Sequence, residues 1–342
     1  MVKKHSFNLN DKVILITGGT GSFGKRFVEN LLQNFPRIKK IIIYSRDELK
    51  QLELKNKYPN KFYPKFRFFI GDVRDTERLK LACSGVNVII HAAALKQVDT
   101  AEYNPTECIA TNITGAENVI KAALANKVER VVALSTDKAC SPNSLYGATK
   151  LVSDKLFIAA NNIRGELTTS FSVVRYGNVM CSRGSVIPFF HDLNSKSEVI
   201  PITDMEMTRF NITLDEGVSI VIKSLSYMLG GEIFVPKIPS YSIKTVLEAI
   251  APKAEYKIIG LRPGEKIHEE MISVTEAFTT LECNDYFVIL PAVSFNVKFE
   301  DYQKFHKGKK LPKGSNYSSN LNDHWETVET LRKRAYNELD NN

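Results

Sequence analysis

The 342-residue sequence predicts an α/β fold, with a doubly wound parallel sheet and a smaller C-terminal domain. Six short apolar runs alternate with helix-length segments, which is the pattern of strands joined by crossover helices. A glycine-rich turn follows the first apolar run directly. The chain is longer than one nucleotide-binding domain requires, and its 43% hydrophobic residues are sufficient for a sizeable core.

The predicted strands are residues 13–16, 41–44, 66–70, 86–90, 131–134 and 171–174. Their nearly continuous apolar character suits a parallel sheet covered by helices on both faces. One connecting helix is expected to begin after Asn104 as N-cap, because Pro105 fits the first turn and Glu107 stands three residues beyond the cap. Open sheets of this kind bind ligands at the carboxyl ends of their strands, so the residues after each strand are the candidates for a site.

Three regions follow from this pattern. Residues 8–176 are expected to form the cofactor-binding domain, to which some later segments can return. Residues 177–300 are expected to form mainly the substrate-binding domain, because polar and basic residues there stand on short loops. The lysine-rich residues 301–342 are expected to form an exposed C-terminal extension.

The glycine turn predicts a dinucleotide site. Gly18, Gly21 and Gly24 stand three apart, which allows a tight turn, close approach of the backbone to a pyrophosphate and close packing of the next helix. The phosphates would then lie at the helix N-terminus. The spacing departs from Gly-x-Gly-x-x-Gly, but the strand before it and the amphipathic segment 27–35 after it favour a Rossmann-type domain. The cofactor contacts expected from this turn are Gly18, Thr20, Gly21, Ser22, Phe23 and Gly24.

The end of the second strand indicates the type of cofactor. An NAD site usually presents an acidic residue there to the ribose hydroxyls. This sequence has Ser45 and Arg46 at that place, with Lys50 one turn further on. A guanidinium binds a 2′-phosphate through charge-assisted hydrogen bonds, so NADP is the favoured cofactor. Asp47 and Glu48 follow immediately and keep NAD open as the alternative.

Tyr146 and Lys150 form a candidate proton-transfer pair. Lys150 stands four positions after Tyr146, so on a helix both side chains lie on one face. A tyrosine pKa falls from about 10 to about 7 if the phenolate is stabilised by roughly 4 kcal/mol, which an adjacent ammonium can largely supply. Tyr146 would then be a general base near neutral pH. Such pairs are common on helix surfaces, and this one gains meaning from the cofactor site.

Polar or small residues follow the next three strands. Asp72 follows the third strand, Ala92-Ala93-Ala94 the fourth and Ser135-Thr136-Asp137-Lys138 the fifth. The alanines leave room for a cofactor. Spacing alone leaves Asp137-Lys138 open as a solvated turn and Lys96 as a loop lysine. His91 is expected to be structural.

Composition excludes several classes of protein. The formal net charge of +8 suits anionic ligands, but it is spread along the chain and forms no nucleic-acid stripe. The five cysteines show no metal-ligand spacing and fit a reducing compartment, so no metal is expected. No apolar run approaches the roughly 20 residues that span a bilayer, and no signal-peptide core follows Met1. We therefore expect a cytoplasmic protein with no membrane partner.

The motifs, taken in order, resemble the extended short-chain dehydrogenases, and among them the soluble UDP-N-acetylglucosamine 4,6-dehydratases. The resemblance is dense over roughly residues 8–275. Residues 45–51 and 145–155 resemble the inverting enzymes that open pseudaminic acid biosynthesis, although inverting enzymes of N-acetyl-L-fucosamine or capsule pathways share most motifs. The motifs that carry the resemblance are residues 17–24, 71–75, 91–96, 135–138, 146–150, 175–179 and 262–266.

The resemblance implies roles for the residues after the fifth strand. Tyr146 would take the proton of the sugar 4-hydroxyl while hydride leaves C4 for NADP, with Lys150 on the nicotinamide ribose and Thr136 near the 4-hydroxyl. Lys138, if neutral, would remove the C5 proton. Asp137, if protonated, would donate to the departing C6 hydroxyl. Hydride returns to C6, so NADP is regenerated in each turnover.

The resemblance also implies the remaining contacts. UDP-N-acetylglucosamine is the expected substrate, and the expected product is UDP-2-acetamido-2,6-dideoxy-β-L-arabino-hex-4-ulose. Asn178 and Arg183 would lie near the substrate together with Lys96, while Arg209 and Arg262 bind the diphosphate and Glu265 the uridine ribose. A homo-oligomer, either a dimer or a hexamer, is expected. The other cofactor contacts expected are Asp72, Val73, Ala92, Ala93, Ala94, Asn112 and Ser135.

Three hypotheses about the function remain. A dehydratase needs Asp137 and Lys138 as acid and base, a 4-epimerase needs only Tyr146 and cofactor, and an NADP-binding sensor needs no intact proton-transfer set. The complete set favours the dehydratase. A C5-retaining dehydratase stays open as well, although the retaining enzymes that act on thymidine diphosphate glucose typically show Asp-Glu at this place.

Overall fold

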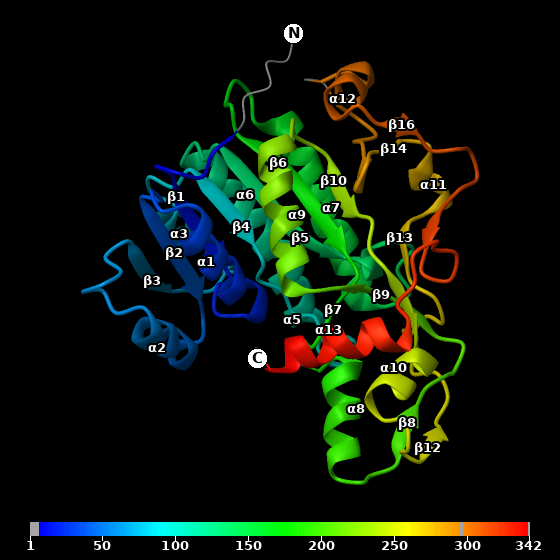
Figure 1. Ribbon diagram of the computed structural model, residues 1–342. Helices are drawn as coiled ribbons and strands as arrows, with labels where there is room; N and C mark the ends of the chain where they lie inside the picture. Colours follow the sequence, from blue (N-terminus) through cyan, green and yellow to red (C-terminus); the bar gives the residue numbers. More distant parts are fainter. Residues whose placement is uncertain (1–6, 183, 295–296, 341–342) are drawn as a thin grey trace.

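A large, mostly parallel sheet forms the centre of the chain in the computed structural model, which describes residues 7–182, 184–294 and 297–340 (Figure 1). Within the described residues this sheet has ten strands, in the order β16-β14-β15-β10-β6-β5-β4-β1-β2-β3. The alternation of strands and helices therefore predicted the fold class correctly. The six predicted strands are β1 (Val13–Thr17), β2 (Lys40–Ser45), β3 (Phe66–Ile70), β4 (Val88–His91), β5 (Arg130–Thr136) and β6 (Ser170–Tyr176).

The parallel half has the strand order of a doubly wound nucleotide-binding sheet. β1 pairs in parallel with both β2 and β4, so the strand order runs outward in one direction from β1 to β3 and in the other direction from β4 to β6. Ligands of open α/β sheets bind in the crevice at such a switch point. The carboxyl ends of β1 and β4, at Thr17 and His91, therefore mark the place where a dinucleotide would lie.

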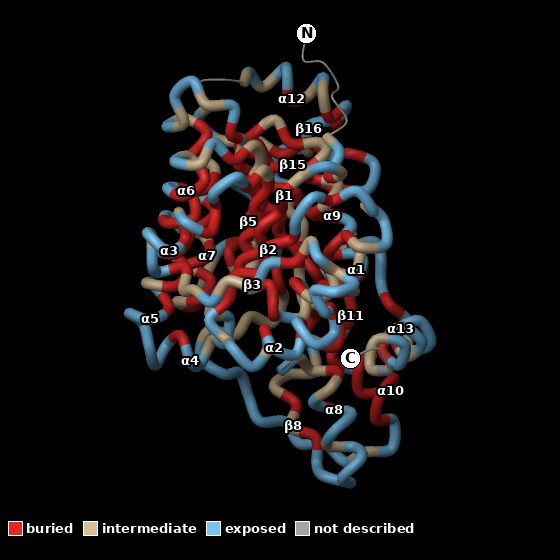
Figure 2. Tube along the Cα trace, turned by 90° about the vertical axis from the view of Figure 1, so that its left-hand side faces the viewer, coloured by how far each residue is buried: buried red, intermediate tan, exposed pale blue. Residues whose placement is uncertain are grey.

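Helices cover both faces of the sheet. α1 packs against α9 on one face, and α6 packs against α3 and α7 on the other (Figure 1). Their apolar sides meet the buried strands, and the core is continuous from β2 to β15 (Figure 2). The covering helices are α1 (Ser22–Asn34), α2 (Glu48–Lys57), α3 (Thr76–Ala82), α6 (Gly115–Ala125), α7 (Leu145–Ile163) and α9 (Leu214–Tyr227). α4 (Val98–Tyr103) and α5 (Pro105–Ile109) pack against α7 in a separate small apolar cluster.

One predicted detail of α5 is wrong. The helix begins at Pro105 as expected, but the Asn104 side chain makes no capping bond and donates instead to the Thr100 carbonyl at 3.0 Å. The preceding helix α4 ends at Tyr103, so Asn104 closes that helix. A π-helical turn, η1 (Ala110–Thr114), joins α5 to α6.

The residues after 176 contribute to two bodies. One group builds a second core below the main sheet: α8 (Val186–Ser195), β8 (Ile200–Ile202), β11 (Ser240–Ser242) and α10 (Ile243–Ile250), with β12 (Tyr256–Ile258) paired to β8. β7 (Asn178–Val179) and β9 (Thr208–Ile212) form a three-stranded sheet with β11, and their apolar side chains pack on the main core. Another group extends the main sheet: β10 (Ile233–Pro236), β14 (Thr280–Glu282), β15 (Tyr286–Ile289) and β16 (Lys309–Lys310). β13 (Glu270–Ile272) and α11 (Val274–Ala277) connect the two.

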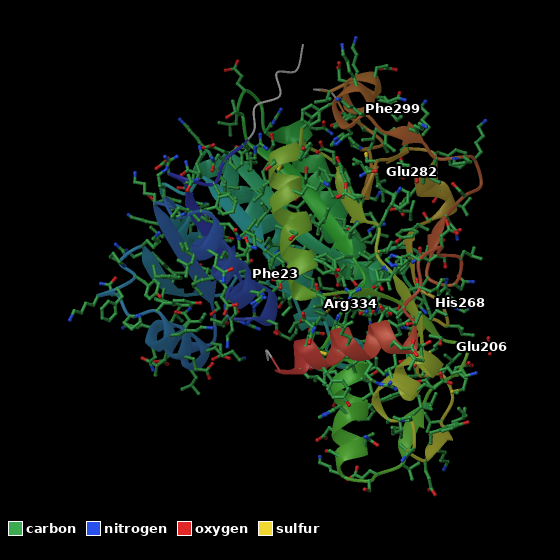
Figure 3. The ribbon with its side chains drawn as sticks, viewed as in Figure 1. Phe23, Glu206, His268, Glu282, Phe299 and Arg334 are labelled. Carbon is green, nitrogen blue, oxygen red and sulfur yellow. The ribbon has the colours of Figure 1, made fainter. Side chains whose placement is uncertain are left out.

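The C-terminal segment packs on the rest of the chain, which corrects the expectation of an exposed extension. α13 (Val328–Asp340) buries Leu331 and Ala335 in the second core beside α10, and Arg334 reaches Glu216 of α9 at 2.7 Å (Figure 3). α12 (Phe299–His306) buries Tyr302, and β17 (Tyr317–Ser318) pairs with β13. The lysines that suggested exposure are themselves exposed: Lys304, Lys307, Lys309, Lys310 and Lys313. None of the described helices is long and apolar enough to cross a bilayer.

Candidate active site

The glycine turn between β1 and α1 has the geometry of a phosphate cradle. Gly18 adopts φ +65°, and a Cβ there would lie 2.9 Å from the Ala93 backbone nitrogen. A Cβ on Gly24 would lie 2.5 Å from the Gly19 carbonyl oxygen, so α1 can pack closely only with glycine there. No side chain caps α1 at Gly21, which leaves its first-turn N–H groups open to an anion.

The other predicted residues of this turn lie beside it. Thr20 is buried, whereas Ser22 and Phe23 are half-buried on the first turn of α1. The Phe23 ring stacks on Phe27 with their centroids 5.7 Å apart, and Figure 3 shows Phe23 at the start of α1. Phe23 therefore fixes the helix start by packing while its backbone faces the cradle.

The end of β2 holds the predicted ribose-side residues. Ser45 is buried and its hydroxyl accepts a hydrogen bond from Gln51 at 3.2 Å. Arg46 is 53% exposed, with its guanidinium 3.5 Å from the Asp72 carboxylate. Lys50 forms an ion pair with Asp47 at 2.6 Å. Both cations thus lie at the strand end, and each has a carboxylate beside it.

The small residues after β4 flank Gly18. Ala92 and Ala93 are half-buried and Ala94 is exposed, so the strand end presents a surface without long side chains. Val73 is buried nearby, against Gly115. Lys96 is exposed on the loop that follows the alanines.

Asn112 lies behind this groove, not on its surface. It is only 1% exposed, its amide nitrogen donates to the Leu95 carbonyl at 2.9 Å, and its oxygen accepts from the Leu95 N–H at 2.8 Å. The amide also donates to Thr149 of α7 at 3.0 Å. Direct contact with a cofactor was predicted, but the protein already occupies these polar atoms, and Asn112 positions the loop after β4.

The residues after β5 converge on one point. β5 ends at Thr136, and the next three residues, Asp137–Ala139, form the short helix η2. The Thr136 hydroxyl donates to Asp137 Oδ1 at 2.9 Å and accepts from the Lys138 N–H at 3.3 Å. Ser135 is turned away and donates to Asp154 at 2.7 Å. The local turn therefore holds Asp137 and Lys138 at the strand end.

The Tyr146–Lys150 pair lies on α7, as the spacing predicted. Ser144 caps this helix by accepting from the Gly147 N–H at 3.2 Å. Lys150 donates to the Leu134 carbonyl at 2.7 Å, which ties α7 to β5. Burial lowers the pKa of Lys150, and Asp154 opposes that shift.

The expected low pKa of Tyr146 is wrong for the chain by itself. Burial raises the pKa of Tyr146 to about 12, and Lys138 together with a hydrogen bond from Thr136 only partly opposes this. Burial, which the spacing of Tyr146 and Lys150 does not indicate, outweighs the neighbouring ammonium, because Tyr146 is only 8% exposed. A Tyr146 phenolate at neutral pH therefore requires further positive charge from a bound ligand.

Lys138 stands between two carboxylates. Its Nζ lies 3.1 Å from Asp137 Oδ1 and 3.0 Å from Glu269 Oε1. Burial would lower the pKa of Lys138, but the two carboxylates outweigh it and the pKa lies above its usual range. Burial raises the pKa of Asp137, against the attraction of Lys138 and with help from Glu269. Asp137 is thus disposed to hold a proton, whereas Lys138 is held as a cation.

Of the predicted substrate residues, Arg209 lies beside this group, with its Nε 3.9 Å from Glu269 Oε1. The Arg209 guanidinium is buried and donates to the carbonyls of Lys266 and Ile267, both at 2.9 Å. Arg262 and Glu265 bind each other through the Arg262 Nε at 2.8 Å. Asn178 begins β7, and its Oδ1 is buried without a hydrogen-bond partner among the described atoms. Arg183 lies outside the described residues.

Sequence reasoning missed a buried charge network beside the site. Arg175, 0% exposed, lies 3.5 Å from Asp154 of α7 and 3.0 Å from Glu276 of α11. The network links β6 to α7 and to the connecting segment β13–α11. Sequence reasoning also missed Glu269. The one feature that could have indicated it is its position three residues after the motif 262–266.

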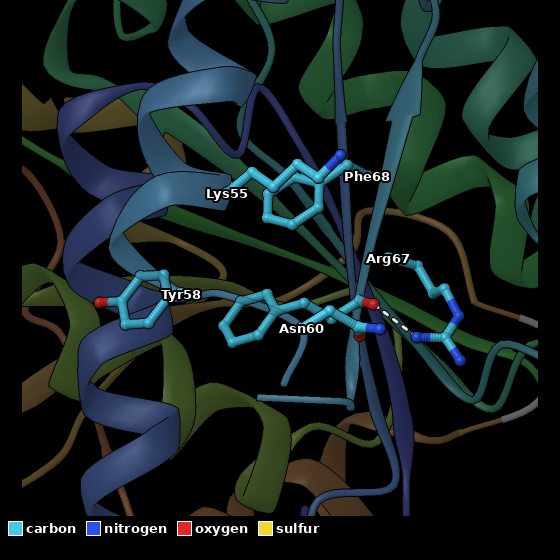
Figure 4. Close-up of a pocket in the computed structure, with 6 residues that line it drawn as sticks. Lys55, Tyr58, Asn60, Arg67 and Phe68 are labelled. Atoms are coloured by element: carbon cyan, nitrogen blue, oxygen red, sulfur yellow. Dashed lines mark hydrogen bonds between the residues drawn. The ribbon is translucent and has the colours of Figure 1, made fainter. Parts of the chain in front are cut away.

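Other features do not compete with this site. A pocket at the far edge of the sheet, between α2 and β3, is lined by Lys55, Tyr58, Asn60, Phe66, Arg67 and Phe68, away from the strand ends (Figure 4). His91 is buried and bonded to Thr17 at 2.8 Å, and burial lowers its pKa to about 3. No cluster of His, Cys, Asp or Glu in the described part of the chain could hold a metal ion.

A doubly wound sheet with a glycine cradle at its switch point and a Tyr-x-x-x-Lys pair beside it defines an extended short-chain dehydrogenase. The comparisons with known proteins agree. The chain belongs to the family described as polysaccharide biosynthesis protein, which matches residues 14–291.

Two curated relatives cover most of the chain. It is 53% identical to "UDP-N-acetylglucosamine 4,6-dehydratase (inverting)" of Campylobacter jejuni over 326 residues, 94% of this chain and 96% of the relative. It is 43% identical to "UDP-glucose 4-epimerase" of Rickettsia conorii over 285 residues, 82% of this chain and 83% of the relative. The two names describe different reactions.

Solved structures agree on the fold. Pen from Bacillus thuringiensis superposes with a TM-score of 0.87 at 35% identity, covering 97% of this chain and 99% of that chain. The dTDP-glucose 4,6-dehydratase DesIV from Streptomyces venezuelae superposes with a TM-score of 0.65 at 23% identity, covering 75% and 86%. The second likeness concerns the fold alone.

Proposed function

We propose that the chain is an inverting UDP-N-acetylglucosamine 4,6-dehydratase. The observation that carries the proposal is the constellation of Asp137, Lys138 and Tyr146 at one strand end, because an elimination of water needs an acid and a base in addition to the oxidation machinery. Lys138 contacts Asp137 at 3.1 Å, and both lie on the short helix that follows β5. The Campylobacter relative, 53% identical over nearly the whole chain, supports the same reaction.

The side chains divide the proton transfers of the proposed reaction among them. Tyr146 takes the proton of the sugar 4-hydroxyl, which Thr136 orients. A bound NADP would supply the hydride acceptor for oxidation at C4 and the hydride donor for C6. The C4 ketone acidifies the C5 proton, which Lys138 removes. Asp137 protonates the C6 hydroxyl as it leaves as water, and Tyr146 gives the proton that it took from the 4-hydroxyl to C5 from the opposite face.

The base role requires Lys138 to lose its proton when the sugar enters. The two carboxylates that contact it, Asp137 and Glu269, stabilise the ammonium form in the chain by itself. The acid role of Asp137 needs no such change, since burial raises its pKa. Before substrate binds, Asp137 therefore favours the protonated form that an acid needs, whereas Lys138 is still an ammonium and cannot yet act as a base.

We propose NADP as the cofactor. Arg46 is exposed at the end of β2 and could bind a 2′-phosphate, with Lys50 one turn away. The phosphates would lie on the N–H groups of α1 after Gly21, and Lys150 would hold the nicotinamide ribose. Asp47 pairs with Lys50 and caps α2, which removes the acidic residue from the ribose position. NAD is the alternative that direct binding measurements would distinguish.

The substrate contacts are proposals as well. Arg209 and Arg262 are proposed for the diphosphate, Glu265 for the uridine ribose, and Asn178, Arg183 and Lys96 for the sugar side. Arg262 and Glu265 bind each other in the chain, so substrate would have to exchange that contact for its own. The Asn178 Oδ1 has no hydrogen-bond partner among the described atoms, so it could accept a hydrogen bond from a sugar hydroxyl.

The test is the mass of the product. Incubation of the enzyme and NADP with UDP-N-acetylglucosamine should convert it to a species lighter by one water, and an Asp137→Asn variant should make this product much more slowly. An isomer of unchanged mass would contradict the dehydratase.

A 4-epimerase is the second candidate, because the Rickettsia relative at 43% identity carries that name. An epimerase needs Tyr146 but leaves Asp137 and Lys138 without a task. A C5-retaining dehydratase shares the mass change and differs only in stereochemistry.

The wider setting follows from the proposed reaction. The product would enter pseudaminic acid biosynthesis as its first intermediate, with an N-acetyl-L-fucosamine or capsule pathway as the alternative. We propose a cytoplasmic enzyme, since the five cysteines are all free and buried. A homo-oligomer, a dimer or a hexamer, is proposed from the resemblance, and light scattering in solution would measure it.

A further inference from the structure

Glu269 is a buried carboxylate in direct contact with Lys138. It is 2% exposed, and its Oε1 lies 3.0 Å from Lys138 Nζ, whereas its Oε2 has no hydrogen-bond partner among the described atoms. Its backbone N–H donates to the Ser319 hydroxyl at 2.9 Å, and its carbonyl accepts from the Ser319 N–H at 2.8 Å. The C-terminal segment therefore holds Glu269 in place beside the reacting groups.

The charges around Lys138 require a second carboxylate. A buried ammonium needs a counter-ion, and Asp137 cannot serve as one while it carries the proton that it gives to the leaving hydroxyl. Glu269 is the anion that remains. The titratable groups around these three side chains are Arg209, Lys266, Tyr146 and Tyr241. Arg209 is the nearest of them to Glu269, with its Nε 3.9 Å from Oε1.

We propose that Glu269 is the proton acceptor that converts Lys138 from ammonium to amine, so that a neutral base and a protonated Asp137 stand together at the sugar. Glu269 acts through Lys138 and is a positioning residue in this sense. The inference rests on the proposed function, because it concerns the group that removes the C5 proton.

The proton step balances without another reactant. An N–H bond of Lys138 breaks and an O–H bond forms on Glu269 Oε1, across the 3.0 Å contact. The Lys138 side chain is 28% exposed, and a sugar that covers it removes the remaining water. Loss of water favours the neutral amine and acid over the ion pair.

The later steps restore the starting state. Lys138 gains the C5 proton and becomes an ammonium again, while Asp137 loses its proton to the departing hydroxyl. Lys138 can then return that proton to Asp137 across their 3.1 Å contact. Glu269 keeps its proton as long as the site stays covered, and gives it back when product leaves and water returns.

The test uses the NADP-loaded enzyme with UDP-N-acetylglucosamine in heavy water. Glu269→Gln keeps the size of the side chain but cannot accept the proton, so incorporation of deuterium at C5 should fall about 100-fold or more. Oxidation at C4 does not need Lys138 as a base, so the absorbance of reduced nicotinamide should still rise. kcat should therefore fall while KM changes little, and formation of reduced cofactor shows that the variant is folded.

Two further variants complete the test. Glu269→Asp keeps the carboxyl but withdraws it by one carbon, so C5 exchange should recover part of the loss. Glu270→Gln is the matched control: the neighbouring carboxylate contacts Ser141 and Asn316, not Lys138, and this variant should keep wild-type C5 exchange. If Glu269→Gln does not fold, Glu269→Asp decides, because unchanged exchange in that variant overturns the proposal.

The outcomes separate the two proposals. Wild-type C5 exchange in Glu269→Gln, with exchange present in the wild type, overturns the role of Glu269 alone. Absence of both exchange and a new methyl product in the wild type overturns the proposed function, and the role of Glu269 with it.

Discussion

Lys138→Met is the substitution whose effects on both activity and stability follow from the structure. The methionine keeps most of the volume but removes the charge that lies 3.1 Å from Asp137 and 3.0 Å from Glu269. Loss of the proposed C5 base should lower the rate of water loss by about 10²–10⁴-fold, whereas binding of the proposed cofactor NADP should be unchanged. C5 deuterium exchange measures the first effect, and titration with NADP measures the second.

The same substitution should destabilise the chain in a pH-dependent manner. Breaking a buried pair costs about 3–5 kcal/mol, and the lower end applies because Lys138 is 28% exposed. In the wild type, burial raises the pKa of Glu269 but Lys138 and Arg209 outweigh it, so its pKa lies below the usual value. This carboxylate therefore contributes stability above its unfolded pKa, and the contribution is lost as pH falls through the folded pKa.

Without Lys138 the sign of that dependence should reverse. Burial then raises the pKa of Glu269, and such a group contributes stability at low pH that is lost as pH rises through the folded pKa. Thermal melts across pH 4–8 should show the deficit of the variant shrinking toward acid pH, about the range in which a raised carboxyl pKa would fall. A deficit that does not depend on pH, or wild-type turnover, would refute the reasoning.

Three more predictions concern the acid, the cofactor and the tail. Asp137→Asn removes the proposed acid but not the hydride path, so reduced cofactor should accumulate during turnover, which its absorbance measures; equal loss of oxidation and elimination would contradict the assignment. Arg46→Ala removes the proposed 2′-phosphate contact and should weaken NADP binding by about 1.5–3 kcal/mol while leaving NAD binding nearly unchanged, as calorimetry would measure; equal effects on both cofactors would exclude the contact. Leu331→Ala opens a cavity where α13 packs beside α10 and should cost about 2–5 kcal/mol in denaturant unfolding, whereas loss near zero would mean that the tail is detached.

The parallel sheet could be predicted because each of its strands is recognisable from its own local sequence. Segments such as 41–44 and 131–134 are continuous apolar runs between helix-length segments, and each lies in a strand with a neighbour on both sides, β2 and β5. The glycine turn could also be predicted from its spacing. Gly18 and Gly24 are the positions where a Cβ would collide with backbone atoms. These features depend on a few neighbouring residues, and local sequence patterns contain them.

The rest depends on contacts between distant segments. Glu269 meets Lys138 only because β13 is brought against η2, and nothing in the surrounding sequence indicates which buried lysine it will face. Among the described side chains of α13, two are fully buried, Leu331 and Ala335, too few to distinguish a docked helix from a lysine-rich tail. The pKa of Tyr146 was misjudged for the same reason, since burial is a property of the whole fold.

Proton NMR of the reaction in heavy water measures both the removal of water from UDP-N-acetylglucosamine and the inversion at C5. We expect a new C6 methyl signal, deuterium at C5 and the ring couplings of the inverted 4-keto sugar. A methyl signal with couplings of the retained configuration would contradict the inversion. Interconversion with the galacto epimer and no methyl signal would contradict the dehydratase itself.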